Sequence, residues 1–266
     1  MVGRLVWHSI AVVLLLNAFA AKGSAWADQG HRIVALAAED LLSERAKRRV
    51  DLFMGTDAQL VDFATWSGAV MADRPETRPW QAIPIKRNAT GIDLERDCPA
   101  GQCVTAKVRE CIGIVRLGVR RQEEMADYLK MLIGLAADLQ QPALSIGPPE
   151  RTRTSKMVTI GDRRMSVMEA WEGGLIELMG TEEEVLERVR KAIAEGPWAD
   201  WTTGTLTDWT WENHLVARER VYPMLEGEGQ FTMDGPELES LLELVTERLA
   251  KSSVRLAVIL EDVWHK

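Results

Sequence analysis

Histidine is scarce in this sequence, and the short motifs that define many enzyme families are absent. The chain of 266 residues contains four histidines, His8, His31, His214 and His265. A site that needs several imidazole ligands is therefore excluded by count. The sequence also lacks G-x-S-x-G, a Walker loop, the Rossmann glycine pattern and H-E-x-x-H. The enzyme classes defined by these motifs are excluded with them.

Positive charge is also in short supply. The chain has 32 lysines and arginines against 40 aspartates and glutamates, which gives a net charge of −8. An acidic surface argues against broad, non-specific binding to nucleic acid, although a deep local cleft could still accept it.

Long apolar runs are missing everywhere except at the N-terminus. There the chain has Arg4, an apolar stretch, and small residues at Gly23 and Ala25, where signal peptidase reads its substrate. We predict a signal peptide over residues 1–25, cleaved after Ala25; the alternative is an uncleaved membrane anchor. Cleavage removes two basic residues and no acid, so the net charge of −8 becomes −10. The expected product is exported, periplasmic or secreted, without a stable membrane anchor.

Cysteine occurs three times. Cys98 and Cys103 bracket the sequence "PAGQ", and in an exported protein so close a pair predicts a small disulfide loop. Cys111 is left over in a segment with helical periodicity, and we interpret it as a buried thiol.

Helical periodicity dominates the remaining sequence, and we predict one mainly α domain over residues 26–266. The segment 120–139 is polar at its start, becomes apolar towards its end and should enter the core. A capping box at Thr181 and Glu184 predicts a helix that stops at Gly196. The C-terminal segment predicts either two helices or one interrupted helix. Strand signals are few, and a minor β-hairpin is expected around the "GD" of 155–167. Further helices are expected over 31–53, 106–119 and 211–225, the last with a break near Pro223.

One carboxylate lies in an unusual place. Asp138 belongs to "LIGLAADLQQPALS", a run of apolar and small residues, where a buried carboxylate must be paired, hydrogen-bonded, metal-bound or protonated. The predicted mature terminus, "WADQGH", places an α-amino group and a carbonyl at Trp26 near the imidazole of His31, and together these can hold a divalent metal. A satisfied structural acid and an ordinary histidine at a helix start are the alternatives.

These features, with their neighbours, resemble the S1/P1 (S-one/P-one) nuclease family over essentially the whole mature chain. "AWADQGHRIVALAAEDLL" is similar to the W-G-x-x-G-H start of that family, and "YLKMLIGLAADLQQPAL" to its central motif with G-D-L-H-Q-P-L-H. "ATWSGAV", "DCPAGQCVTAKVRECI", "AWEGGLIE" and "DWTWENHLVARERVYP" follow in the order and spacing of further family motifs. The resemblance implies a mainly α, phospholipase C/nuclease-like fold. It also implies a secreted, zinc-dependent phosphodiesterase that cuts single-stranded nucleic acid and removes 3′-phosphates from nucleotides.

The resemblance also implies a cluster of three zinc ions, most of whose ligands are replaced here. The first ion would use Trp26, His31 and Asp138, and all three are retained. The second shares Asp138, but its other three positions are Gly68, Gln81 and Gly134. The third has Leu144, Met168 and Glu172, and of these only Glu172 keeps a charge. An arginine that would face the phosphate is replaced by Met71.

Two hypotheses follow. The first is a degenerate, non-catalytic family member with a binding or structural role, for which single-stranded nucleic acid or nucleotides are the ligands that the resemblance suggests. The second is a metal-dependent phosphoesterase of narrower scope that uses one zinc held by Trp26, His31 and Asp138, with Glu172 as an additional candidate. In a weaker form of this hypothesis, the metal only locks the N-terminus down. Both expect at most one zinc ion rather than three.

Overall fold

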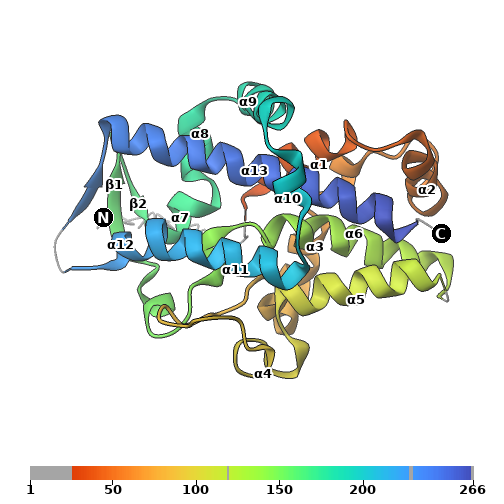
Figure 1. Ribbon diagram of the computed structural model, residues 1–266, viewed down its shortest axis with the longest axis horizontal. Coiled ribbons are helices and arrows are strands. Elements are labelled where there is room, and N and C mark those ends of the chain that lie inside the picture. The colour runs from red at the N-terminus through yellow and green to blue at the C-terminus, as the bar shows by residue number, and fades with distance from the viewer. Residues whose placement is uncertain (1–25, 119, 228–229, 265–266) are drawn as a thin grey trace, which may run out of the picture.

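The computed structural model describes residues 26–264, apart from residue 119 and residues 228–229, and it is mainly α-helical (Figure 1). The predicted fold class is thereby confirmed. The predicted signal peptide lies outside the described residues. Within the described part of the chain, no helix has the length and apolar character needed to cross a membrane.

The longest helix, α13 (Gly235–Val263), runs without interruption through the molecule, so the prediction of two helices or one interrupted helix for the C-terminal segment was wrong. It packs against α1 (Asp28–Glu39), α9 (Glu182–Glu195) and α6 (Gln122–Asp138), helices that come from widely separated parts of the chain (Figure 1). Because α13 is covered on several sides, its central residues from Leu249 to Leu260 are almost all buried.

The remaining elements surround this core. The other α-helices are α2 (Glu44–Met54), α3 (Trp66–Asp73), α4 (Leu94–Asp97), α5 (Val104–Leu117), α7 (Val167–Glu169), α8 (Leu175–Met179), α10 (Trp198–Thr202), α11 (Leu206–Val216) and α12 (Tyr222–Leu225). Short 3-10 turns are η1 (Leu60–Phe63), η2 (Pro75–Gln81), η3 (Pro99–Gly101), η4 (Pro142–Ser145) and η5 (Glu150–Arg153), and π-helical turns are η6 (Ala170–Gly174) and η7 (Ala217–Val221).

The helix predicted over 31–53 is in fact two helices, α1 and α2, and this part of the prediction was wrong. The chain turns at residues 40–43, and Ser43 starts α2 by accepting a hydrogen bond from the backbone N–H of Ala46 at 3.2 Å. The Ser43 backbone N–H and hydroxyl in turn donate to Glu261 of α13. Ser43, held by Glu261, therefore begins a new helix within the apolar stripe that suggested a single one.

The predicted hairpin is present and carries a third strand. Strands β1 (Met157–Ile160) and β2 (Arg163–Ser166) are antiparallel, and β3 (Phe231–Met233) pairs with β1 in parallel. The sequence did not predict β3, because three residues carry too little alternation to indicate a strand. The capping box of α9 is formed as predicted, with the Thr181 hydroxyl accepting from the Glu184 backbone N–H.

The segment predicted to break near Pro223 leaves α-helical geometry one turn earlier. The π-helical turn η7 follows α11, and Pro223 then stands in the first turn of α12, where its missing N–H costs least. The helix ends at Leu225, two residues after the proline.

Candidate metal centre

The structure brings Trp26, His31 and Asp138 together in the protein interior. His31 lies in the first turn of α1 and Asp138 is the last residue of α6, and the His31 Nε2 atom lies 2.8 Å from Asp138 Oδ1. Trp26 has no exposed surface, and its indole N–H donates a hydrogen bond to the carbonyl of Ala137 at 3.1 Å. The three positions that the sequence nominated thus form one cluster, although Asp138 lies more than a hundred residues from Trp26 and His31 in the chain.

A glycine allows this close approach at the start of α1. A Cβ atom on Gly30 would lie 2.9 Å from the Cβ of Trp26 and 2.9 Å from a methyl group of Ile176. The spacing W-x-x-x-G-H therefore has a physical reason: the chain folds back on itself, and only glycine leaves room for the tryptophan beside the histidine.

Two polar atoms of the cluster have no partner. His31 Nδ1 and Asp138 Oδ2 are buried, and neither makes a hydrogen bond of good geometry to any described residue. Nε2 is the ring atom that contacts the carboxylate, so Nδ1 lies on the side of the imidazole away from Asp138, and one cation cannot bind Nδ1 and Oδ2 together. An imidazole, a carboxylate and the backbone of Trp26 are ligand types that zinc accepts, but an ion bound by His31 and Asp138 would have to displace the hydrogen bond between Nε2 and Oδ1.

The pKa values of His31 and Asp138 both lie above their ordinary values. Burial lowers the pKa of His31, but the charge and hydrogen bond of Asp138 and the nearby backbone of Trp26 and Ala27 raise it by more, so this pKa lies above its ordinary value. Burial raises the pKa of Asp138 against the opposing influence of His31. The two groups therefore titrate as a coupled pair, and a metal would have to displace the proton of their hydrogen bond.

The backbone of Glu172 contacts the segment that carries Trp26. It belongs to the π-helical turn η6, and its carbonyl accepts a hydrogen bond from the backbone N–H of Ala27 at 2.5 Å. Burial and the charge of Glu169 raise the pKa of its carboxyl group to about 7. Across the described residues, no three His, Cys, Asp or Glu side chains form a group that could hold a metal. A metal at this centre would therefore depend on the backbone of Trp26 for its third donor.

The position of the second predicted ion is filled by protein. A Cβ atom on Gly134 would lie 2.0 Å from Ser67 Oγ and 2.8 Å from Ser67 Cβ. Helix α3, which carries Ser67 and Gly68, therefore packs directly on α6 with no space for a side chain at 134. Ser67 is buried, with 1% of its surface exposed, and Met71, at the position of the expected arginine, is buried one turn further along α3.

The other replaced positions are also part of the packing. Leu144 is buried in a small apolar cluster with Ala82, and Met168 packs against the main core. Gln81 is buried at the end of η2. Leucine offers no donor atom and a thioether is a weak ligand for zinc, so these side chains do not fit a second or third ion.

Sequence analysis missed the polar residues that fix the turn after Asp138. Gln141 accepts from the backbone N–H of Leu144 at 2.9 Å, its side chain donates to the carbonyl of Trp171 at 3.2 Å, and its carbonyl accepts from Asn213 at 3.0 Å. Gln140 accepts from the guanidinium groups of Arg248 and Arg255, which also bind Glu212. The two adjacent glutamines in an apolar setting were the signal that could have indicated this network.

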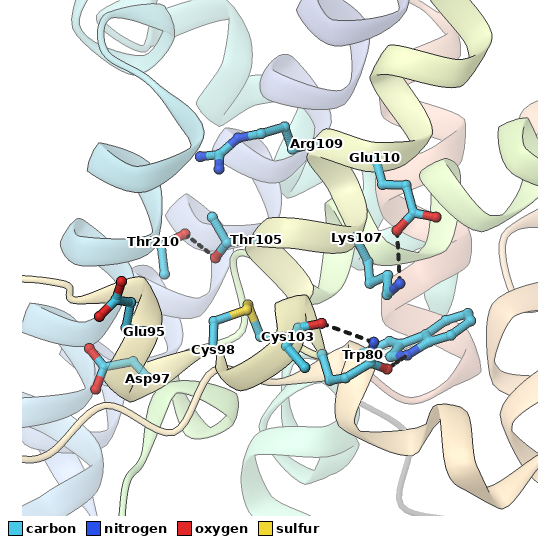
Figure 2. Close-up of a disulfide and its surroundings, with 12 residues drawn as sticks. Trp80, Glu95, Asp97, Cys98, Cys103, Thr105, Lys107, Arg109, Glu110 and Thr210 are labelled. Atoms are coloured by element: carbon cyan, nitrogen blue, oxygen red, sulfur yellow. Dashed lines mark hydrogen bonds and ion pairs between the residues drawn. A yellow bond between two sulfur atoms is a disulfide. The ribbon is translucent and has the colours of Figure 1, made fainter.

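The predicted disulfide is formed. Cys98 and Cys103 are joined, and the loop they close leads directly into α5 (Figure 2). At the base of α5 the hydroxyl groups of Thr105 and Thr210 lie 2.8 Å apart and link this helix to α11. Cys111 is a buried free thiol as predicted, and burial raises its pKa to about 12.

Comparison with known proteins supplies one match. The family model described as S1/P1 nuclease matches residues 26–265, which is nearly all of the chain after the predicted signal peptide. A search of curated proteins finds no match.

Proposed function

Because the chain belongs to the S1/P1 nuclease family, we propose that it is an exported, degenerate member that has lost the family's cleavage of single-stranded nucleic acid. The observation that carries this proposal is the contact between α3 and α6. Ser67 occupies the space that a ligand side chain at Gly134 would need, which supports the loss of the second zinc site by packing as well as by a change of residue.

The expected loss of activity has a chemical reason. In multi-zinc sites the ions activate a water molecule and clamp the attacking and leaving oxygens of an in-line displacement. The residues here offer donors for one ion at most. The position of the arginine that would face a phosphate is occupied by Met71, which carries no charge. Since removal of a single charge-stabilising donor costs roughly two to three orders of magnitude in rate, the combined replacements leave little of the family activity.

The first experiment measures cleavage. Mature protein beginning at Trp26, purified free of host nucleases and supplied with zinc, is incubated with single-stranded DNA and RNA. We expect no turnover above that of Asp138→Asn protein prepared in parallel, because contaminants would be common to both. Turnover by the native chain that the Asp138→Asn variant lacks would contradict the proposal.

The second candidate function, a phosphoesterase with one zinc, is favoured by the contact of His31 Nε2 with Asp138 Oδ1 beside the buried Trp26, and by the unpartnered Asp138 Oδ2 atom. When bound, the zinc supplies Lewis-acid chemistry or, in the structural form of this hypothesis, holds the N-terminus. Trp26, through its amine and carbonyl, His31 and Asp138 would be its ligands. The amine exists only after cleavage at Ala25.

Metal analysis decides this second candidate. One zinc per mature chain is expected at neutral pH, and it should be lost in His31→Gln and in a chain with one extra residue before Trp26. His214→Gln is the matched control, because His214 is also buried but hydrogen-bonds to the Ser145 carbonyl at 3.2 Å. Hydrolysis of a 3′-nucleotide that follows zinc content would establish the enzyme, whereas zinc without hydrolysis would establish the structural role. A mature chain that binds no zinc would exclude both.

A further inference from the structure

A cavity of about 360 Å³ lies between α3, η2, α5 and α6, apart from the His31–Asp138 pair. The residues of α6 that line it are Glu124, Asp127, Tyr128 and Met131, which follow one face of the helix towards its N-terminal half. This volume is in the range of small-molecule sites. No part of the proposed metal centre lines it.

The walls are aromatic and the floor is apolar. Trp66, Trp80 and Tyr128 line the cavity together with Val70 and Met131, and the buried thiol of Cys111 also faces it. A planar or alkyl group would therefore lose water against aromatic surface on more than one side.

The charged residues of the lining are mainly acidic. Four carboxylates line the cavity, from Asp73, Glu110, Glu124 and Asp127, and three of them are paired with cations: Glu110 with Lys107, Glu124 with Arg121, and Asp127 with Lys130. Asp73 has no ion pair or side-chain hydrogen bond within the described part of the chain. The carboxylate of Asp73 would therefore attract a cation at the cavity.

The rings already hold ammonium groups of the protein itself. Lys107 lies over the ring of Trp80, 4.6 Å from its centroid, while it pairs with Glu110 at 2.8 Å (Figure 2). Lys130, which does not line the cavity, lies 5.4 Å from the ring centroid of Trp66. The indole rings are thus held in the arrangement in which a cation meets a π face beside a carboxylate.

We propose that this cavity binds an organic cation, an ammonium group carrying an alkyl or aryl substituent, with the ammonium against the indole rings of Trp66 and Trp80 and the substituent against Val70 and Met131. This ligand class differs from the phosphate esters of the family. The inference is independent of the proposed loss of cleavage, because it uses none of the residues of the metal centre.

The test compares three probes of related shape. Benzyltrimethylammonium is cationic, neopentylbenzene is its neutral shape match, and phenyl phosphate is anionic. Binding to the mature protein is measured by tryptophan fluorescence and by calorimetry. We expect the cation to bind about 10-fold more tightly than the neutral probe, which is the preference that one desolvated cation–π contact provides. Phenyl phosphate should not compete.

Substitutions locate the site. Trp66→Leu should weaken binding of the cation several-fold, and Asp73→Asn should weaken it about 2-fold, while Glu76→Gln, also exposed on the neighbouring turn but outside the lining, should not. The sharpest variant is Lys107→Met, which removes the competing ammonium from Trp80 and should tighten binding about 3-fold or more. A damaged fold cannot give that gain.

The control for this gain is Lys191→Met on α9, which should change nothing. The proposal would be overturned if neopentylbenzene bound as tightly as benzyltrimethylammonium. It would also be overturned if Lys107→Met bound the cation more weakly while its unfolding temperature equalled that of the native chain. Absence of saturable binding of the cation by the native chain would overturn it as well.

Discussion

At the scale of single residues, the ion pair of Asp138 and His31 explains how a carboxylate survives at the end of an apolar helix. Asp138 is 1% exposed and His31 is 4% exposed, and their side chains are 2.8 Å apart. Neither charge would be tolerated alone at this depth, because an isolated buried charge costs several kcal/mol. The two residues stabilise each other, and each still has an unused polar atom.

Glu172 gives a prediction at the same scale. Its pKa is about 7 in the folded chain, raised from 4.5 by burial and by Glu169, so the folded state holds more protons than the unfolded state between these values. Stability should therefore fall as pH rises from about 4.5 to about 7. With chelator present, Glu172→Gln should raise the free energy of unfolding at pH 8 by about 1–2 kcal/mol, after allowance for partial exposure.

Urea denaturation at pH 5 and pH 8 checks this expectation. The difference between Glu172→Gln and the native chain should nearly vanish at pH 5, and Glu195→Gln, which is exposed on α9, should show no such difference at either pH. Destabilisation by Glu172→Gln at pH 8 would show that the carboxylate is held by a favourable partner.

At the scale of elements, α3 packs directly on α6 at Gly134. The backbone of α6 at Gly134 approaches Ser67 so closely that the steric clash of an added methyl group outweighs the higher helix propensity of alanine. We expect Gly134→Ala to lower the free energy of unfolding by about 1–3 kcal/mol, because the new methyl group meets both Ser67 Oγ and Ser67 Cβ.

A double-mutant cycle tests this contact. Ser67→Gly should rescue Gly134→Ala by removing both atoms, which gives a coupling of about 1 kcal/mol or more in thermal or urea unfolding. Gly113→Ala is the matched helical control, since nothing lies within 4 Å of its Cβ position, and it should be neutral or stabilising. Additive effects of the two substitutions would show that α3 does not rest on α6 in this way.

The disulfide loop is a second element with a measurable contribution. Cys98 and Cys103 are separated by five positions, and closing so short a loop stabilises by about 2 kcal/mol in the chain-entropy description. The double substitution Cys98→Ser and Cys103→Ser should lower stability by that amount. A reducing agent should destabilise the native chain but not the double variant, and equal sensitivity of both would mean that the bond contributes nothing.

At the scale of the whole molecule, one charged network joins α13 and α11 to the turn that follows α6. Arg248 and Arg255 of α13 both bind Glu212 of α11 and Gln140. Arg248 is 1% exposed and Arg255 is 3% exposed. Their positive charges are tolerated in the interior because Glu212 and Gln140 meet them from two other elements.

The network predicts loss of stability in acid. Burial raises the pKa of Glu212, but Arg248 and Arg255 outweigh it and lower this pKa to about 2 from 4.5. A depressed pKa means that the stabilisation is present above about pH 4.5 and is lost as the pH falls towards 2. Glu212→Gln should cost about 3 kcal/mol at pH 7 and should flatten the acid limb of the unfolding profile.

Denaturation from pH 7 down to pH 2.5 measures this, with Glu243→Gln on the exposed side of α13 as the control. An unchanged acid profile in Glu212→Gln would place the source of acid sensitivity elsewhere. The effect is opposite in sign to that of Glu172, because Glu212 has three cationic partners, Arg248, Lys251 and Arg255, whereas Glu172 is buried beside an anionic neighbour.

Much of the fold could be predicted from local sequence. Periodicity indicated the helices, the Thr181–Glu184 box fixed the start of α9, and the spacing of Cys98 and Cys103 indicated their bond. These features depend on neighbours within a few positions. The break between α1 and α2 was missed because it depends on Glu261, which contacts Ser43 from the far end of the chain.

The sequence by itself determined the helical class and the disulfide, because each follows from residue type and local spacing, whereas Trp26, His31 and Asp138 were nominated as metal ligands through the resemblance to the family. Only the tertiary structure decided that Trp26, His31 and Asp138 meet, that Gln140 is held by two buried arginines, and that Ser67 fills the gap at Gly134. The sequence shows that residue 134 has no side chain, but whether the space beside it stays open depends on the tertiary contact, which here is made by Ser67 of α3.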